Sequence, residues 1–223
     1  MLRPTRLFSD AQKTAVEDAI FDAEQRTGAE IVVAVAARSG GYRRFADVFA
    51  LALAVVVLFA VMWMFGEGSD SLGLPARTTL HPGLIVGTLV ATFFLAVVLA
   101  DLSPAIIRAV AGRRTLRRHV ERSAPAHFQR LRLRRTEDHV GLLIYISLLE
   151  HEVVIVPDDG ILAALNEGDL DPIRETILDG MKQGRLPEAL TSAIEQAGRV
   201  LGERLPAPKR NMDELGNELY LID

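Results

Sequence analysis

The sequence predicts an α/β domain that is interrupted by a pair of membrane-spanning helices. Two long apolar runs lie in the first half of a chain of 223 residues, and short β-branched apolar segments typical of buried strands stand on both sides of them. A length of this size suits one to two domains. A single strand cannot bury itself, so the strand before the runs is expected to pair with the strands after them. The apolar runs are then an insertion into one domain.

The first part of the domain is predicted as a helix followed by a strand. Ser9 precedes residues 10–27, whose apolar side chains recur with helical spacing, and Gly28 follows as a stop. Residues 30–37 read EIVVAVAA, a run expected in a strand that is buried on both faces. This first part covers residues 1–44.

Two candidate membrane spans occupy residues 45–101. Residues 45–65 contain one charge, Asp47, and residues 83–100 contain none. At 1.5 Å per residue these runs are about 31 and 27 Å long, close to the hydrocarbon thickness of a bilayer. They are predicted to form a hairpin of two transmembrane helices.

Flanking arginines indicate the orientation of this hairpin. Arg43 and Arg44 precede the first span, five arginines follow the second within residues 108–118, and the loop between the spans has Arg77 as its one basic residue. Basic residues concentrate on the cytoplasmic side of membrane proteins. The sequence therefore predicts a multi-pass protein of the plasma membrane, the inner membrane of a bacterium, with both termini in the cytoplasm.

The second part of the domain covers residues 102–205. Residues 104–135 are predicted as a basic connector helix interrupted at Pro125. An antiparallel hairpin and two helices that pack on the sheet follow it, over residues 141–148, 153–156, 172–182 and 187–205. Residues 206–223 combine proline with scattered charges and are predicted as a mobile tail.

Charge is strongly segregated in this second part. Residues 102–136 hold 10 arginines and one acidic residue, whereas residues 137–223 hold 18 acidic and 7 basic residues. Nine of the arginines lie in residues 113–135, and the first interpretation of this block is contact with anionic lipid headgroups. Docking to the acidic half of the chain, or to an acidic partner, is an alternative. Nucleic acid binding is excluded because the block offers Phe128 alone as a stacking platform.

Several classes of chemistry are excluded by the residues that are missing. The absence of cysteine removes disulfides, thiolate nucleophiles and cysteine-ligated metals. The sequence has neither a phosphate-binding glycine loop nor the Gly-x-Ser-x-Gly elbow of α/β-hydrolases. A complete catalytic set is therefore not visible in the sequence.

A cluster of carboxylates is the remaining candidate site. If the first two strands run parallel and the third returns antiparallel, the starts of two strands and the end of the third share one end of the sheet. The acids at that end are Glu30, Glu137, Asp138, Asp158 and Asp159. Clustered carboxylates suit calcium or magnesium, which can polarise a phosphoryl oxygen or activate water. Acids that simply face solvent at strand ends are the alternative.

The order of these segments resembles the TPM domain. The first part matches a pattern of Ala23-Glu24 followed by Thr27, Gly28, Glu30 and three apolar residues. The second matches a longer pattern through Thr136, Gly141, Leu143, Ile144, Ser147, Leu148, Glu150, Val153, Ile155, Asp158, Gly160 and Ile161. The chain is most similar to the bacterial membrane branch of the family, in which two spans split the domain.

This resemblance implies a three-layer α/β/α sandwich with a mixed sheet. It also implies calcium binding in some members and, for a plant thylakoid-lumen member, weak acid phosphatase activity. The chain departs from the family at Arg3-Pro4-Thr5-Arg6 and at Asp138-His139-Val140-Gly141, both of which bear on a cation site. We therefore expect a membrane-anchored binding, assembly or quality-control factor with an unidentified membrane protein as partner, or alternatively a cation-assisted phosphatase.

Overall fold

The computed structural model describes residues 3–65, 81–130, 140–166, 168–207 and 217–223. The chain forms two compact units. The hairpin unit spans Gly41–Arg113, and the sheet unit joins the residues up to Gly40 with those from Arg114 onward. Two segments that are distant in sequence therefore build one α/β unit.

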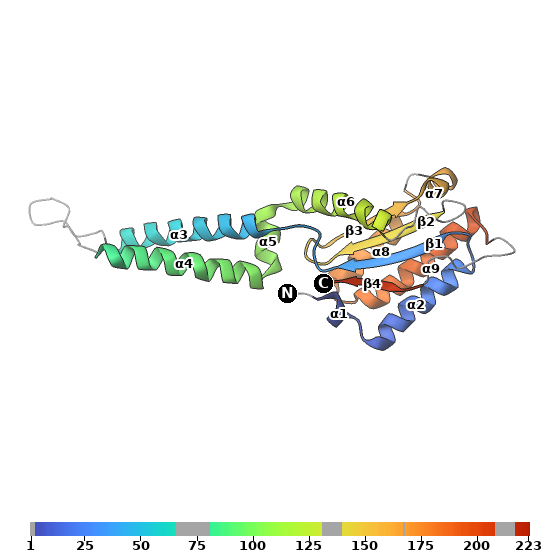
Figure 1. The fold of residues 1–223 in the computed structure, drawn as a ribbon, viewed down its shortest axis with the longest axis horizontal. Coiled ribbons are helices and arrows are strands. Elements are labelled where there is room, and N and C mark those ends of the chain that lie inside the picture. Colours follow the sequence, from blue (N-terminus) through green and yellow to red (C-terminus); the bar gives the residue numbers. More distant parts are fainter. Residues whose placement is uncertain (1–2, 66–80, 131–139, 167, 208–216) are drawn as a thin grey trace, which may run out of the picture. The chain divides into compact units, whose positions relative to one another are not determined.

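The sheet unit contains a four-stranded mixed sheet in the order β3-β2-β1-β4 (Figure 1). Its strands are β1 (Glu30–Ala36), β2 (Gly141–Ser147), β3 (Glu152–Pro157) and β4 (Leu219–Ile222). β1 pairs in parallel with β2, and β2 pairs antiparallel with β3. The predicted pairing across the apolar runs and the predicted hairpin are both confirmed. β1 and β2 are buried along their whole length, which explains their continuous apolar sequence.

The prediction of a mobile tail is wrong for residues 219–222. These residues form β4, which pairs in parallel with β1 from Val33↔Leu219 to Ala36↔Ile222. Four residues, Leu-Tyr-Leu-Ile, carry too weak a local signal to stand out beside the preceding charges, and the edge of β1 supplies the missing stabilisation. Residues 208–216 lie outside the described residues.

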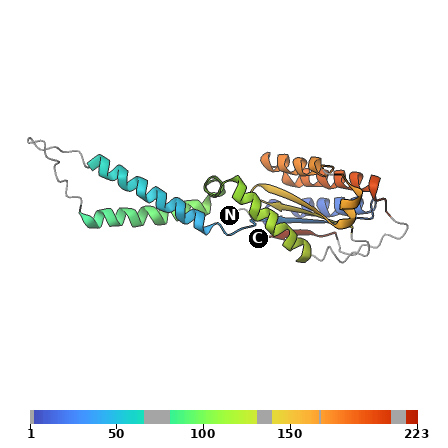
Figure 2. The same ribbon diagram turned by 90° about the horizontal axis from the view of Figure 1, so that it is seen from above.

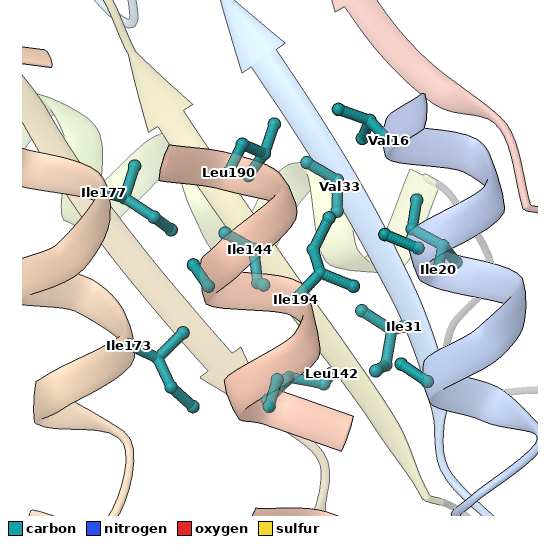
Figure 3. Packing of buried hydrophobic residues seen from close by; sticks show 14 of the residues in the cluster. Val16, Ile20, Ile31, Val33, Leu142, Ile144, Ile173, Ile177, Leu190 and Ile194 are labelled. Atoms are coloured by element: carbon teal, nitrogen blue, oxygen red, sulfur yellow. The ribbon is translucent and has the colours of Figure 1, made fainter. Parts of the chain in front are cut away.

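Three helices cover one face of the sheet: α2 (Asp10–Glu24), α8 (Asp171–Lys182) and α9 (Leu186–Arg204). Figure 3 shows Val16 and Ile20 of α2 and Leu190 and Ile194 of α9 packed against strand residues such as Val33. Ser9 caps α2 in a capping box with Gln12, which fixes the start of the helix where the sequence predicts it. The two helices predicted against the sheet are therefore confirmed.

One long helix, α6 (Arg113–Arg130), covers the opposite face, so that the unit has three layers (Figure 2). The predicted break at Pro125 is wrong, because α6 continues through this residue. Ala124 and Phe128 on either side of it are buried against the sheet, and this packing offsets the cost of a proline inside a helix. The break falls instead at Gly112, whose φ of 71° ends the preceding helix.

Two short helices complete the sheet unit. They are α1 (Pro4–Leu7) and α7 (Asp159–Ala164). α7 begins directly after β3, and Asp158 is its N-cap residue. With six residues, α7 is too short to show helical periodicity in the sequence.

The hairpin unit consists of α3 (Arg43–Phe65), α4 (Pro82–Leu102) and α5 (Pro104–Ala111). α3 and α4 pack against each other, and Figure 2 shows that they converge toward α5 and diverge toward their other ends. Both are long and apolar enough to cross a membrane. Their buried residues are alanines, whereas large apolar side chains such as Phe59 and Trp63 are 67% and 75% exposed. The apolar surface of this unit therefore faces outward instead of forming a globular core.

Candidate functional site

The sequence predicts that acidic residues gather where the starts of β1 and β2 meet the end of β3. In the structure these three strand ends do lie together. Glu30 at the start of β1 pairs with Gly141 at the start of β2, and Pro157 at the end of β3 pairs with Leu142. Asp158 follows directly, and its N–H donates to the carbonyl of Gly141 over 2.8 Å. Glu30 and Asp158 are buried, and Asp159 is exposed. Glu137 and Asp138 lie outside the described residues.

Asp158 has an unusual carboxylate. One oxygen, Oδ1, accepts from the N–H of Asp159 over 3.0 Å, and the backbone carbonyl accepts from the N–H groups of Ile161 and Leu162, so the residue starts α7. The other oxygen, Oδ2, is buried and has no hydrogen-bond partner in the described part of the chain. A buried carboxylate oxygen without a partner is costly, and it is the kind of group that a cation or a donor satisfies.

The fit of this end of the sheet to a cation is incomplete among the described residues. These residues contain no group of three His, Asp or Glu side chains that could hold a metal ion. Calcium takes six to eight oxygen ligands, and magnesium requires six in an octahedron. Glu30 and Asp158 together would supply a minority of them. The predicted cation site therefore stays a prediction.

A second polar cluster, which the sequence did not predict, lies at the opposite end of the same strands. The carboxylate of Glu150 is buried and accepts from the N–H of Ser39 over 2.7 Å and from the hydroxyl of Ser147. Ser39 Oγ in turn donates to Ser147 Oγ over 2.7 Å and lies 3.0 Å from the Tyr145 hydroxyl. The cluster ties the end of β1 to the β2–β3 hairpin. Ser147 and Glu150 belong to the family-like pattern, but the sequence gives no sign that Ser39 joins them.

Helix α6 adds one aromatic contact to this cluster. The ring of His127 stacks on Tyr145 with 5.1 Å between the centroids. Burial, with a smaller contribution from the charge of Arg130, lowers the pKa of His127, so its neutral form is favoured. Burial raises the pKa of Tyr145, although its bond to Ser39 opposes this effect. Both rings are therefore uncharged near neutral pH, and their stacking links α6 to β2.

An open groove lies beside the edge strand β3. It has a volume of about 530 Å³ and is lined by Ile155, Pro157, Ile161, Leu162, Leu165, Asn166, Gly168, Leu170, Asp171 and Arg174, which come from β3, α7, α8 and the segment before α8. Leu162 is 61% exposed here. The guanidinium of Arg174 donates to the carbonyl of Val153 over 2.9 Å and pairs with Glu152 over 3.3 Å. The floor and walls are mostly apolar.

The register of the sheet determines which backbone groups face this groove. The N–H of Asp158 points toward β2, and in an antiparallel pair the direction alternates along the strand. The backbone groups of Val153, Ile155 and Pro157 therefore point away from β2, and the bond from Arg174 to the Val153 carbonyl agrees with this. Among the described residues no hydrogen bond is made to the N–H or carbonyl of Ile155. β3 thus offers a free donor and acceptor beside an apolar hollow.

The predicted arginine block lies on α6 as far as Arg130. Val120, Ala124 and Phe128 face the sheet, and the arginines are exposed. Arg132, Arg134 and Arg135 lie outside the described residues. Six of the nine arginines of the block therefore lie on the exposed side of α6.

Comparison with known proteins supports the family resemblance. Residues 99–200 match the family model of the TPM domain. Among solved structures, the chain is similar to the BA42 protein of the psychrophilic bacterium Bizionia argentinensis, with a TM-score of 0.56, 20% identity, and coverage of 96% of this chain and 94% of that one. At this level of identity the similarity shows the fold alone. None of the curated proteins matches the chain.

Proposed function

We propose that this TPM-domain chain is a membrane-anchored protein whose sheet unit binds an extended segment of a partner protein along β3. The observation that carries the proposal is the free backbone of Ile155 beside the apolar groove. An edge strand pairs with another extended chain through unpaired backbone N–H and C=O groups, and a neighbouring hollow accepts one of the side chains of that partner. An unidentified membrane protein with an exposed extended segment fits both features.

The membrane anchor is supported by the two helices of the hairpin unit. Their length and composition suit a bilayer, and their large apolar side chains are on the outside, where lipid would cover them. The basic residues Arg43, Arg44 and Arg108 flank the spans and favour cytoplasmic termini, in the inner membrane of a bacterium. We therefore place the proposed binding, assembly or quality-control role at the cytoplasmic face.

The anchor is tested first by extraction of membranes that contain the full chain. An integral protein stays in the pellet after treatment with alkaline carbonate, and protease added to spheroplasts leaves both termini intact. Release by carbonate would contradict the anchor. Cleavage of either terminus from the outside would contradict the orientation without affecting the anchor.

Binding along β3 is tested with a display library of random ten-residue peptides selected on the full chain in lipid nanodiscs. Selected peptides should alternate apolar and polar residues, as strands do. Ile155→Pro removes an N–H that the sheet does not use, and Leu162→Ser removes an exposed wall of the groove. Each should weaken binding by about tenfold or more: Ile155→Pro because it removes one backbone hydrogen bond, and Leu162→Ser because it removes apolar contact area.

Phe21→Ser is the matched control, because Phe21 is a large apolar residue exposed on α2 and does not line the groove. Equal binding to wild type and to both groove variants would contradict the proposal. A loss with Phe21→Ser as well would show that apolar surface in general is recognised.

A second candidate function, a cation-assisted phosphatase, is favoured by the partnerless oxygen of Asp158. A divalent cation at this end of the sheet would supply the Lewis acid that polarises a phosphomonoester. In that case Asp158→Asn should abolish phosphate release by the full chain with calcium or magnesium, and Glu203→Gln, at an exposed position of α9 outside the candidate cluster, should leave it unchanged. Activity that survives Asp158→Asn would exclude this candidate.

A further inference from the structure

Helix α6 uses its apolar face for the core of the sheet unit. Leu116, Val120, Ala124 and Phe128 recur every four residues and are buried, and the last three pack against β1 and β2. A basic amphipathic helix with a free apolar face would insert that face into a lipid surface. The apolar face of α6 already packs on the sheet, so α6 can contact a membrane or a partner protein only through its exposed face.

The opposite side of α6 carries a basic stripe. Positions two residues away from the buried ones lie about 200° around the helix. The stripe consists of Arg114, Arg118, Arg122, Ala126 and Arg130, all of them exposed. Its arginines extend over about 24 Å at 1.5 Å per residue. No acidic residue interrupts it.

The charges of this stripe are not used within the described part of the chain. The ion pair on α6 joins Arg117 to Glu121, one turn apart and beside the stripe. None of the four stripe arginines forms an ion pair with a described acidic residue. The acidic second half of the chain therefore does not neutralise them through its described residues.

We propose that this stripe binds the phosphate groups of anionic lipids, an inference that rests on the proposed membrane anchor. The guanidinium group is a planar fork that matches phosphate oxygens, and a row of such groups suits a surface with repeated anions. A nucleic acid would also need exposed rings for stacking, and Phe128 of α6 is buried. Ten residues separate the end of α4 from the start of α6, so the stripe is close in sequence to the proposed anchor.

The absence of cysteine from the chain allows a direct test. Ala126→Cys places a single fluorophore within the stripe, on the full chain in nanodiscs of phosphatidylcholine with or without phosphatidylglycerol. Quenching by a nitroxide lipid headgroup reports how close α6 comes to the surface. We expect quenching to increase with phosphatidylglycerol and to fall again with salt, because the charges are exposed.

The variant Arg114→Gln, Arg118→Gln, Arg122→Gln removes three charges and keeps good helix formers. It should weaken the response to anionic lipid by about 100-fold, because each arginine near the surface contributes roughly a factor of five. The matched control replaces three exposed arginines outside α6, Arg26, Arg199 and Arg204, by glutamine. This control should respond like the wild type.

A wild-type response that does not depend on phosphatidylglycerol would overturn the inference and favour an acidic protein surface as the partner. An equal loss in both triple variants would overturn it too, since net charge alone would then explain the response. A response to added inorganic phosphate at constant ionic strength, without anionic lipid, would assign the stripe to free phosphate instead. Failure of the chain to enter nanodiscs would contradict the membrane anchor and is recognised before any quenching is measured.

Discussion

The N–H of Ser39 donates a hydrogen bond of 2.7 Å to Oε1 of Glu150, across 111 residues of sequence that include both long apolar helices, α3 and α4. This bond joins the end of β1 to the turn between β2 and β3. The second carboxylate oxygen accepts from Ser147, so both oxygens of a buried acid are satisfied. Glu150 therefore adds a side-chain link to the backbone bonds that Leu148 and Leu149 donate to Ala36 and Ala37 at this end of the unit.

Replacement of Glu150 by alanine should destabilise the sheet unit by about 2–4 kcal/mol. The change leaves the Ser39 N–H and the Ser147 hydroxyl without their acceptor, and each lost buried partner costs about 1–3 kcal/mol. Urea unfolding of the full chain in detergent, followed by circular dichroism, measures the effect. Glu203→Ala, at an exposed position of α9, is the control and should change the unfolding free energy by less than about 0.5 kcal/mol.

The β-branched apolar runs in the sequence are enough to predict the two central strands of the sheet. The runs at Glu30–Ala36 and Gly141–Ser147 are continuous and apolar because both faces are covered, and this pattern is visible without coordinates. The sequence does not predict β4, because these four residues are stabilised as a strand by pairing with the edge of β1 and have only a weak strand signal of their own. It also predicts a break at Pro125 that does not occur, because packing of α6 on the sheet outweighs the low helix propensity of proline.

The candidate sites were predictable to different degrees. The meeting of Glu30 and Asp158 at one end of the sheet follows from strand order and direction, which the sequence indicates. The contact of Ser39 with Glu150 depends on side chains far apart in the sequence, and no spacing rule connects them. The groove beside β3 depends on α7, a helix too short to be recognised from periodicity.

The pH dependence of stability should show the effect of His127. Burial lowers its pKa in the folded chain below the ordinary value of 6.5, so the unfolded chain binds more protons as the pH falls below that value. The stabilisation is thus complete above pH 6.5 and is lost as the pH falls through the lowered pKa. His127→Phe keeps a ring against Tyr145 and removes the titration.

We would measure the unfolding free energies of the wild type and of His127→Phe across this pH range. The comparison tests whether His127 makes stability depend on pH. Their difference should be constant above pH 6.5 and should change in favour of the variant below it. A wild-type curve that stays parallel to that of the variant at all pH values would show that His127 does not titrate differently in the folded chain.

Gly198 permits the close approach of α9 to α2. A Cβ atom at this position would lie 2.7 Å from Cβ and 2.9 Å from Cα of Ala23, closer than van der Waals contact allows. Gly198→Ala should therefore destabilise the sheet unit by about 1–3 kcal/mol despite the better helix propensity of alanine, which contributes about 1 kcal/mol. Ser192→Ala, on the exposed side of α9, is the control and should be neutral or slightly stabilising in the same urea titration.

The two helices of the hairpin unit should separate when their contact residues are enlarged. Ala46, Ala50 and Ala54 of α3 and Ala96 and Ala100 of α4 are the buried residues of the pair. Small residues at four-residue intervals let helix backbones approach closely in a membrane, where packing replaces the hydrophobic effect as the source of association.

Ala50→Leu inserts three carbon atoms into this contact, whereas Val48→Leu adds one at a position that is 60% exposed. Nitroxide labels on Val56 and Leu95, both exposed, report the helix separation in nanodiscs by electron paramagnetic resonance. The distance distribution should broaden and shift to longer values with Ala50→Leu and remain that of the wild type with Val48→Leu, and an unchanged distribution in both would show that this alanine contact does not hold the hairpin together.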